Sequence, residues 1–231
     1  MRTWLNPDIR AVFFDAVGTL LFPYPSAPAI YADVARRAGV ELSEAEVRTR
    51  FVEAFRKQEA VDRAAAWVTS EARERDRWRV IVGETLAGVP DAEGCFRELY
   101  ELFAKPTAWK VDPSAAEVIR QISDRGIRVG MGSNYDARLW SVLDGFPELA
   151  PLRERTVVSA AVGFRKPAAE FFREVTRVAD CEPEQILFVG DDIDNDYHGA
   201  TAMGLHAVLL DDRNRATNIA RRIATLLELT D

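Results

Sequence analysis

The chain has 231 residues, enough for one large domain or for a core domain that carries an insertion. Its contents of 48% hydrophobic and 29% charged residues are typical of a soluble globular protein. The net charge of −7 argues against nucleic acid as an electrostatic partner, and two cysteines exclude a disulfide framework. No apolar run reaches membrane-spanning length, and residues 1–10 lack an apolar signal core. We therefore expect a cytoplasmic protein without membrane partners, whose oligomeric state the sequence does not indicate.

The first informative segment is a short apolar run, Ala11 to Phe14, which stops at Asp15 and is followed by a turn at Gly18. This pattern predicts a buried strand that delivers Asp15 to the carboxyl edge of a sheet, where open α/β folds place their chemistry. A carboxylate at this position can attack phosphorus or carbon covalently. Two residues later, an acid would be able to protonate a leaving group, but the chain has Val17 there.

Residues 26–104 have helical patterns and no convincing strand. An apolar face over 30–38 ends at a glycine, and a capping box over 43–46 opens a second helix. Further helices are expected over 70–87 and 91–104. These stretches predict a small helical bundle, in which we interpret the aromatic side chains, Trp67 and Trp78 among them, mainly as core.

After Pro106 the pattern alternates between helices and strands. The expected elements are a helix over 113–125 with its N-cap at Asp112, a strand over 127–132, a helix over 137–144, a strand over 156–159, a helix over 167–179, a strand over 185–189, a helix over 196–203, a strand over 206–210 and a helix over 216–228. Such alternation predicts parallel strands covered by helices on both faces. We predict an α/β fold, with a Rossmann-like doubly wound sheet formed by 1–22 and 105–231 and a helical domain inserted over 23–104.

Three further polar sites follow expected strands or open a helix. Ser133 and Asn134 close the strand over 127–132, where a hydroxyl and backbone N–H groups can hold phosphate oxygens. Lys166 stands at a helix start, where its charge and the helix dipole both favour an anion. The segment 190–196 carries four carboxylates, and such a density of acids favours a hard cation such as Mg²⁺.

The order of these sites resembles the haloacid dehalogenase-like superfamily. The matching motifs are Asp15-Ala16-Val17-Gly18-Thr19, Ser133, Lys166-Pro167 and Gly190-Asp191 to Asp196. The resemblance extends over nearly the whole chain, because the helical insertion stands where this family carries its cap. The Asp-x-Val-Gly-Thr-Leu form further resembles the branch called haloacid dehalogenase-like hydrolase domain-containing protein 3.

The resemblance implies a hydrolase that works through covalent catalysis with Mg²⁺. Asp15 would be the nucleophile and would form an aspartyl-phosphate, while also contacting the metal. The backbone carbonyl of Val17 and the carboxylate of Asp191 would bind Mg²⁺ directly. Asp196 would hold metal-bound water or orient Lys166.

The same resemblance assigns the substrate-binding residues. Lys166 and Ser133 would bind the substrate anion and the charge that develops during transfer, which makes them catalytic. Thr19 and Asn134 would support substrate binding at the site. The expected substrate is a small phosphorylated metabolite, selected by a mobile cap that also excludes water.

Val17 departs from the pattern of family phosphatases, which carry a second aspartate there as general acid and base. General acid–base help is worth about 10²–10⁴-fold in rate, so hydrolysis is expected to be weak or restricted to good leaving groups. Haloacid dehalogenases and phosphonatases remain alternatives, the second with Lys57 as a Schiff-base candidate, although Lys57 also fits an ordinary solvated helix face. A catalytically impaired binding protein is the alternative from a different class.

Overall fold

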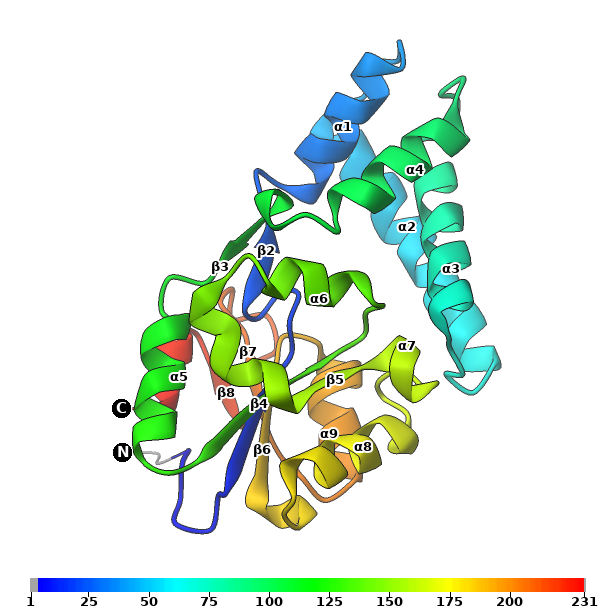
Figure 1. Ribbon diagram of the computed structural model, residues 1–231. Coiled ribbons are helices and arrows are strands. Elements are labelled where there is room, and N and C mark those ends of the chain that lie inside the picture. Colours follow the sequence, from blue (N-terminus) through cyan, green and yellow to red (C-terminus); the bar gives the residue numbers. More distant parts are fainter. Residues whose placement is uncertain (1–3, 231) are drawn as a thin grey trace.

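The computed structural model describes residues 4–230, and its centre is a sheet of six parallel strands in the order β5-β4-β1-β6-β7-β8 (Figure 1). The strands are β1 Ala11–Phe14, β4 Arg128–Ser133, β5 Thr156–Val158, β6 Ile186–Gly190, β7 His206–Leu210 and β8 Arg222–Ile223. Phe14 of β1 pairs with Met131 on one side and Val189 on the other. The residues that follow β1, β4 and β6 therefore meet at one edge of the sheet.

Helices cover both faces of this sheet, as the alternation predicts. They are α5 Ala115–Asp124, α6 Arg138–Leu143, α7 Ser159–Val162, α8 Ala169–Ala179 and α9 Gly199–Ala202, with 3-10 helices at Pro106–Ala108, Pro147–Arg155, Pro183–Gln185 and Leu226–Leu229 and a π-helix at Ile193–His198. Side chains alternate across β1: Val12 and Phe14 enter one apolar cluster, whereas Ala11 and Phe13 enter the other. Two cores on opposite faces confirm the doubly wound α/β class.

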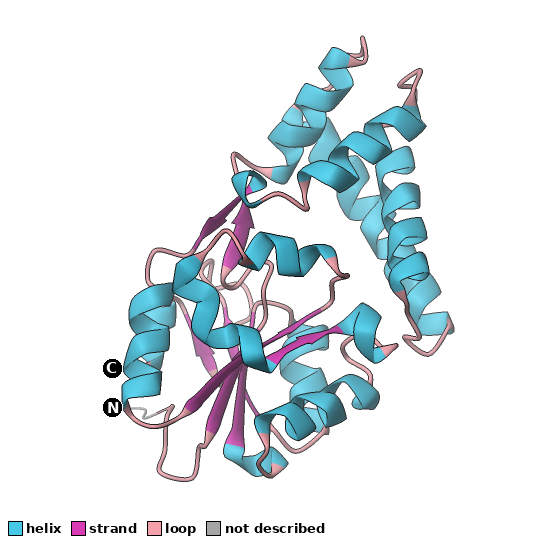
Figure 2. Ribbon diagram, viewed as in Figure 1, coloured by secondary structure: helices cyan, strands magenta, loops and turns pink. Residues whose placement is uncertain are grey.

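A helical unit, defined here as α1–α4, lies apart from the sheet (Figure 2). Its helices are α1 Ala27–Arg37, α2 Glu44–Ala64, α3 Glu71–Thr85 and α4 Ala92–Leu102. The capping box at the start of α2 forms, because Ser43 accepts from the Glu46 backbone and the Glu46 side chain accepts from the Ser43 backbone. Its buried core includes Tyr31 and Phe96.

A two-stranded antiparallel ribbon connects the helical unit to the sheet. It consists of β2 Leu21–Pro23 and β3 Trp109–Val111. Neither strand is recognisable in the sequence, because three residues are too few for a visible alternation of apolar and polar side chains. The ribbon places the entry to α1 beside the exit from α4.

The expected helix over 216–228 is wrong. Its apolar residues, including Ile219 and Ile223, have helical spacing, but Ile223 instead joins the sheet in β8 beside Leu210. Asp211 accepts hydrogen bonds from the Arg215 and Ala216 backbones and holds the start of this stretch in turns. Two other predicted helices begin at different residues. The helix α5 begins at Ala115, after a turn capped by Asp112. The helix expected over 196–203 is preceded by and partly replaced by the π-helix Ile193–His198.

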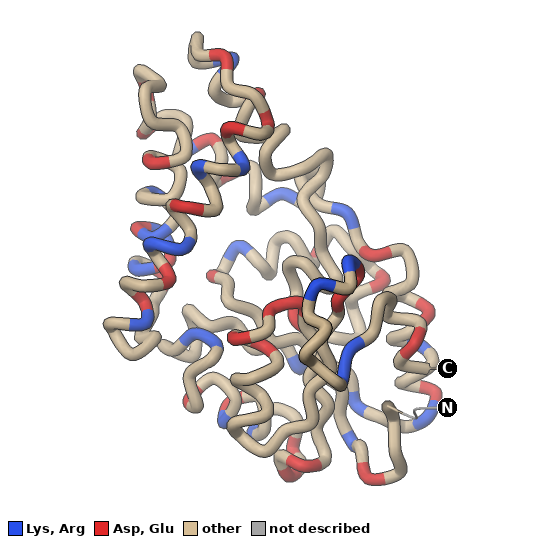
Figure 3. The backbone as a smooth tube through the Cα atoms, turned by 180° about the vertical axis from the view of Figure 1, so that it is seen from behind, with Lys and Arg blue, Asp and Glu red and all other residues tan. Residues whose placement is uncertain are grey.

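Charged residues of both signs are interspersed over the helical unit and the helices around the sheet (Figure 3). Most of the ion pairs on the helical surfaces join residues three or four positions apart on one helix, such as Asp33 with Arg36 and Arg37. Pairs of this kind contribute little to stability. Within residues 4–230, no helix is both long enough and apolar enough to cross a membrane.

Candidate active site

Lys166 connects the polar groups at the carboxyl edge of the sheet. Its Nζ lies 2.6 Å from Asp15 Oδ1, 2.6 Å from Asp196 Oδ1 and 2.9 Å from the carbonyl oxygen of Gly132. An ammonium group has three hydrogens to donate, and these three acceptors account for them. Lys166 therefore holds the Asp15 carboxylate in place, and its effect on a substrate anion would come from its charge rather than from a free hydrogen bond.

Asp15, Asp191 and Asp196 form one carboxylate cluster, in which one oxygen of each lies within 4.8 Å of the others. Glycines make this approach possible. A Cβ on Gly18, whose φ is +100°, would lie 2.5 Å from Asp191 Oδ2, and one on Gly190 would overlap the Asp196 carboxylate. At both positions a side chain would clash with a carboxylate, so only glycine fits. Gly18 also has a positive φ, which favours glycine.

The protonation of the cluster reflects burial and mutual repulsion. Asp191 is exposed as a residue, but the protein atoms around its carboxyl group restrict its hydration and, together with the charges of Asp15 and Asp196, raise its pKa to about 8. Burial outweighs the Lys166 charge at Asp15 and at Asp196, so that the pKa of Asp15 is raised and that of Asp196 is about 7. Burial also lowers the pKa of Lys166, but Asp15 and Asp196 outweigh this and hold it above its ordinary value. A bound cation would favour the charged form of all three carboxyls.

The donor set of this cluster suits a hard divalent cation. Carboxylate oxygens are the ligands that Mg²⁺ prefers, and three of them converge here. Asp192 and Asp194 belong to the same segment but are placed differently. Asp192 accepts hydrogen bonds from the backbones of Asp194 and Asn195 and caps the π-helix, while Asp194 is exposed.

The three polar residues that the sequence assigns to substrate binding beside Lys166 differ in what they contact. Ser133 lines the cavity beside Asp15, and its hydroxyl has no hydrogen-bond partner among the described residues. Asn134 also lines the cavity, but its amide clamps the backbone of Lys166, accepting from its N–H at 2.7 Å and donating to its carbonyl at 3.1 Å. Thr19 is fully buried and donates to Asp191 Oδ1 at 3.5 Å, so it contacts the carboxylate cluster.

A cavity of about 360 Å³ joins the sheet edge to the helical unit. Val17 is half-buried, lines this cavity beside Asp15 and packs against the main apolar core. Trp78, interpreted from sequence as core, is only half-buried and lines the cavity, whereas Trp67 is not among the described residues that do so. The other lining residues are Asp15, Pro23, Ala27, Tyr31, Phe51, Phe55, Arg77, Val82, Phe96, Leu99, Tyr100, Phe103, Trp109, Ser133, Asn134, Tyr135, Arg138, Arg165, Lys166, Asp191, Asp192, Asn195 and Asp196.

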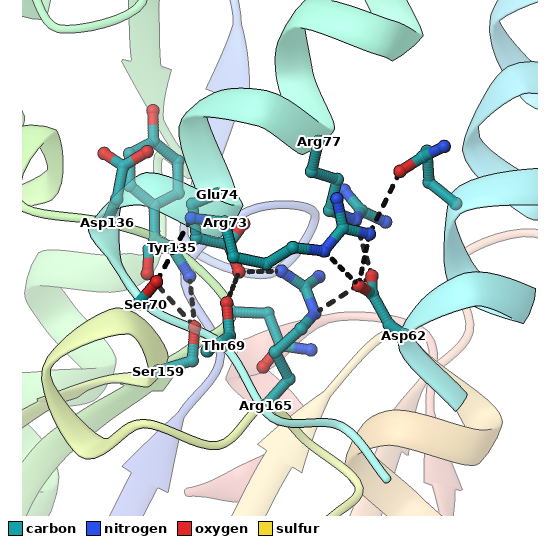
Figure 4. A network of polar contacts seen from close by, with 12 residues as sticks. Asp62, Thr69, Ser70, Arg73, Glu74, Arg77, Tyr135, Asp136, Ser159 and Arg165 are labelled. Atoms are coloured by element: carbon teal, nitrogen blue, oxygen red, sulfur yellow. Dashed lines mark hydrogen bonds and ion pairs between the residues drawn. The ribbon is translucent and has the colours of Figure 1, made fainter. Parts of the chain in front are cut away.

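A buried polar network holds the helical unit against the loop that precedes Lys166 (Figure 4). Asp62 of α2 accepts from Arg73 at 2.6 Å and from Arg77 at 2.8 Å, both on α3. Arg165 pairs with Glu74 of α3 and lies 3.7 Å from Asp62. Asp62, Glu74, Arg77 and Arg165 are each at least 95% buried. Because Arg165 is the neighbour of Lys166 in the chain, the network connects the position of the helical unit to Lys166.

Asp62→Ala is expected to destabilise the protein by about 3–5 kcal/mol, because it leaves buried guanidinium charges without their partner. Urea unfolding followed by circular dichroism measures this change in the free energy of unfolding. Asp76→Ala is the matched control, since Asp76 pairs with Arg79 on the exposed face of α3 and should change stability by no more than about 0.5 kcal/mol. A loss below about 1 kcal/mol for Asp62→Ala would contradict the structural role of the network.

A second contact between the helical unit and the rest of the protein lies at Tyr100 of α4. Its hydroxyl donates to Asp136, which is also bound by both Nε and Nη2 of Arg138, and the Arg138 guanidinium lies 3.6 Å from the Tyr100 ring centroid. Sequence reasoning missed Asp136 and Arg138, although they follow the Ser133 motif closely. It also missed Asp62 and Glu74, because acids on charge-rich helices give no signal of burial.

Lys57 is exposed and forms ion pairs with Glu53 and Glu84 on the surface of the helical unit. These partners raise its pKa, whereas a Schiff-base lysine needs a lowered one. Lys57 is not among the described residues that line the cavity. The geometry therefore favours the solvated-face interpretation over the phosphonatase role.

The parallel sheet, with a carboxylate after β1, a lysine before α8 and a group of acids after β6, has the arrangement of an α/β hydrolase. The chain belongs to the haloacid dehalogenase-like hydrolase family, which it matches over residues 9–204, so the predicted family and enzyme class are confirmed. It is 33% identical over 212 residues to human haloacid dehalogenase-like hydrolase domain-containing protein 3, covering 88% of this chain and 82% of that protein. The predicted resemblance to this branch is thus also confirmed.

Two further similarities concern phosphatases. A glyceraldehyde 3-phosphate phosphatase of Methanothermobacter thermautotrophicus is 30% identical over 99 residues, which are 42% of this chain and 43% of that protein. The crystal structure of a HAD phosphatase from Thermococcus onnurineus superposes with a TM-score of 0.65 and 22% identity, covering 96% of both chains. At this identity the structural likeness shows the shared fold.

Proposed function

We propose that the protein is a Mg²⁺-dependent phosphatase that forms a phosphoaspartate at Asp15. The observation that carries this proposal is the arrangement around Lys166, which fixes one oxygen of Asp15 while Asp191 and Asp196 converge beside it. A nucleophile held in one orientation at the end of a cavity is prepared for attack on a bound phosphoryl group. The similarity to a named phosphatase supports this choice among hydrolase chemistries.

The proposed reaction has two steps. In the first, a carboxylate oxygen of Asp15 forms a bond to phosphorus as the bond from phosphorus to the leaving oxygen breaks, and the leaving group departs with its electron pair. In the second, water attacks phosphorus, the bond to Asp15 breaks, and both protons of the water remain with the released phosphate. The charge of Lys166 and the hydroxyl of Ser133 would stabilise the phosphoryl oxygens in both steps.

Asp15, Asp191 and Asp196 would hold the Mg²⁺, with the carbonyl of Val17 as a further ligand implied by the family resemblance. When bound, the ion would neutralise negative charge on the phosphoryl group and the carboxylates. Thr19 would orient Asp191, and Asn134 would fix the backbone of Lys166. Their contribution to substrate binding would thus pass through Asp191 and Lys166.

The carboxylate cluster favours phosphoryl transfer over dehalogenation. Expulsion of a halide needs no cation, whereas three acids this close together repel one another unless a cation is bound. Val17 supplies no proton, so the proposed reaction favours leaving groups that depart as stable anions.

The helical unit would serve as the cap, with boundaries at 23–104, over a core formed by 1–22 and 105–231. In this structure it contacts the core through Arg165 and through Tyr100, and its side chains form most of the apolar cavity wall. A cap in this position would exclude water from the phosphoryl group and select the substrate.

Asp191→Ala is expected to reduce the stabilisation that Mg²⁺ gives and to reduce phosphate release from acetyl phosphate. In the wild-type protein, Mg²⁺ should raise the Tm, because an ion that binds only the folded state stabilises it. Differential scanning fluorimetry with and without Mg²⁺ measures the shift, and Asp194→Ala, which removes an exposed acid of the same segment, is the matched control. An unchanged Mg²⁺ response in folded Asp191→Ala would place the ion elsewhere and overturn the proposed metal site.

A further inference from the structure

The cavity has two chemically different halves. The half at the sheet edge carries the carboxylates, Lys166 and Ser133, which suit a phosphoryl group and a cation. The opposite half is walled mainly by aromatic side chains, namely Tyr31, Phe51, Phe55, Trp78, Phe96 and Phe103. Phe51, Phe55, Trp78 and Phe103 are only half-buried, so part of their ring surface is accessible. An apolar group on the substrate would cover this surface.

Most polar groups of the aromatic half are already engaged. The Tyr135 hydroxyl and the Trp109 indole N–H both donate to the Phe103 carbonyl at 3.1 Å. The Tyr100 hydroxyl and Arg138 are bound to Asp136, as described above. Arg77 Nη2 has no acceptor among the described residues, but this nitrogen is itself buried, and its guanidinium lies over the Phe55 ring at 4.4 Å.

This wall does not suit a phosphorylated sugar or polyol. Each hydroxyl buried without a partner costs about 1–3 kcal/mol. Among the described residues of the aromatic half, the Tyr31 hydroxyl and the Trp78 indole N–H have no hydrogen-bond partner, and Tyr31 is buried whereas Trp78 is half-buried. Two such groups match one polar substituent on an apolar body, and they are too few for a chain of hydroxyls.

The chemistry of the leaving group independently argues against a sugar or polyol phosphate. Val17 offers no proton, so the leaving oxygen departs as an anion. A phenol has a pKa near 10, several units below that of an aliphatic alcohol, and its anion leaves far more readily. The requirement for a weakly basic leaving group and the requirement for an aromatic body are both met by a phenol.

We propose that the substrate is an aryl phosphate, a phosphate monoester of a phenol, whose ring lies against the aromatic wall. This inference rests on the proposed phosphatase function. Asp15 forms the bond to phosphorus, the bond from phosphorus to the phenolic oxygen breaks, and the phenoxide takes its proton from bulk water after release. A cavity of about 360 Å³ has room for one or two fused rings.

Steady-state hydrolysis with Mg²⁺ tests the two requirements separately. Phenyl phosphate should have a kcat/KM at least about tenfold above that of benzyl phosphate, because both carry one ring and only the first leaves as a phenoxide. 2-Naphthyl phosphate should have a KM at least about tenfold below that of acetyl phosphate, which has a good leaving group but no ring. Glycerol phosphate should be the poorest substrate. Equal or better turnover of glycerol phosphate would overturn the inference while leaving the phosphatase function in place.

Trp78→Ala tests the wall itself. It should raise the KM for 2-naphthyl phosphate by at least about fivefold more than it changes the KM for acetyl phosphate. Trp140→Ala is the matched control. Trp140, on α6, is also half-buried, but its ring lies under the Arg153 guanidinium and it is not among the described cavity residues. Equal effects of Trp78→Ala on both substrates would contradict binding of the ring at this wall.

A binding measurement separates this inference from the proposed function. The ligand is (2-naphthyl)methylphosphonate, which cannot be hydrolysed in this way. With Mg²⁺ present, isothermal titration calorimetry should show that it binds at least about tenfold tighter than methylphosphonate. Trp78→Ala should remove most of this difference in affinity. If no phosphate is hydrolysed but this preference is present, the function fails and the ligand class stands. If both phosphonates bind equally, the ligand class fails.

Discussion

Asp15→Asn should abolish phosphate release, with a loss of about 10⁴-fold or more in kcat/KM for acetyl phosphate. The amide has the shape of the carboxylate, and its oxygen can still accept the 2.6 Å hydrogen bond from Lys166. It is nevertheless a poor nucleophile, so no phosphoryl group is transferred to it. A phosphate-release assay measures the loss, and mass spectrometry of rapidly quenched wild-type protein should locate a phosphoryl adduct on Asp15.

The fold should survive this substitution. Burial and two neighbouring carboxylates act against the charge of Asp15, so its removal relieves repulsion in the cluster and should leave the Tm without Mg²⁺ unchanged or higher. Asp194→Asn, at an exposed acid, should leave activity unchanged and serves as the control. A folded Asp15→Asn variant that retains full activity would remove the proposed nucleophile.

The convergence of Asp15, Lys166 and the acids after β6 was predictable, because parallel strands bring distant motifs to one edge of the sheet. Asp15, Ser133 and Asp191 directly follow or end buried apolar runs, and the parallel register of β1 with β4 and β6 places them together. Lys166 is not on a strand, and its position depended on the family resemblance. The sequence identified these residues but not the detailed contacts, such as the engagement of all three Lys166 donors.

The residues that join the two units were not predictable from local pattern. Asp62 and Arg77 occur in helices rich in exposed charge, and their burial results from contact with the Arg165 loop, more than 80 positions further along the chain. The aromatic side chains of the helical unit do pack in its apolar cluster, as predicted, but several of them also face the cavity, which the sequence did not indicate. An aromatic residue at helical spacing indicates an apolar face, but the pattern does not distinguish a packed core from a cavity, as Trp78 illustrates.

Val17→Asp should raise the kcat/KM for alkyl phosphates by about tenfold or more, within the range of general acid catalysis. Val17 is half-buried and lines the cavity beside Asp15, so a carboxyl group there would lie near the leaving oxygen. An alkoxide leaves badly without a proton, whereas a phenoxide or a carboxylate does not need one. Benzyl phosphate should therefore gain strongly, and phenyl and acetyl phosphates should gain little.

Val17→Asn is the matched control, because it has the size and polarity of aspartate but no proton to donate to the leaving group at neutral pH. Its rates on all three substrates should lack the selective gain of Val17→Asp. The gain should also decline as the pH rises above the pKa of the new carboxyl group, since only the protonated form acts as an acid in the first step. The contrary result is an equal response of benzyl and acetyl phosphates to Val17→Asp, in a folded variant that retains the Mg²⁺-dependent Tm shift. The missing acid would then not limit departure of the leaving group. The preference for phenols would in that case depend on the aromatic wall alone.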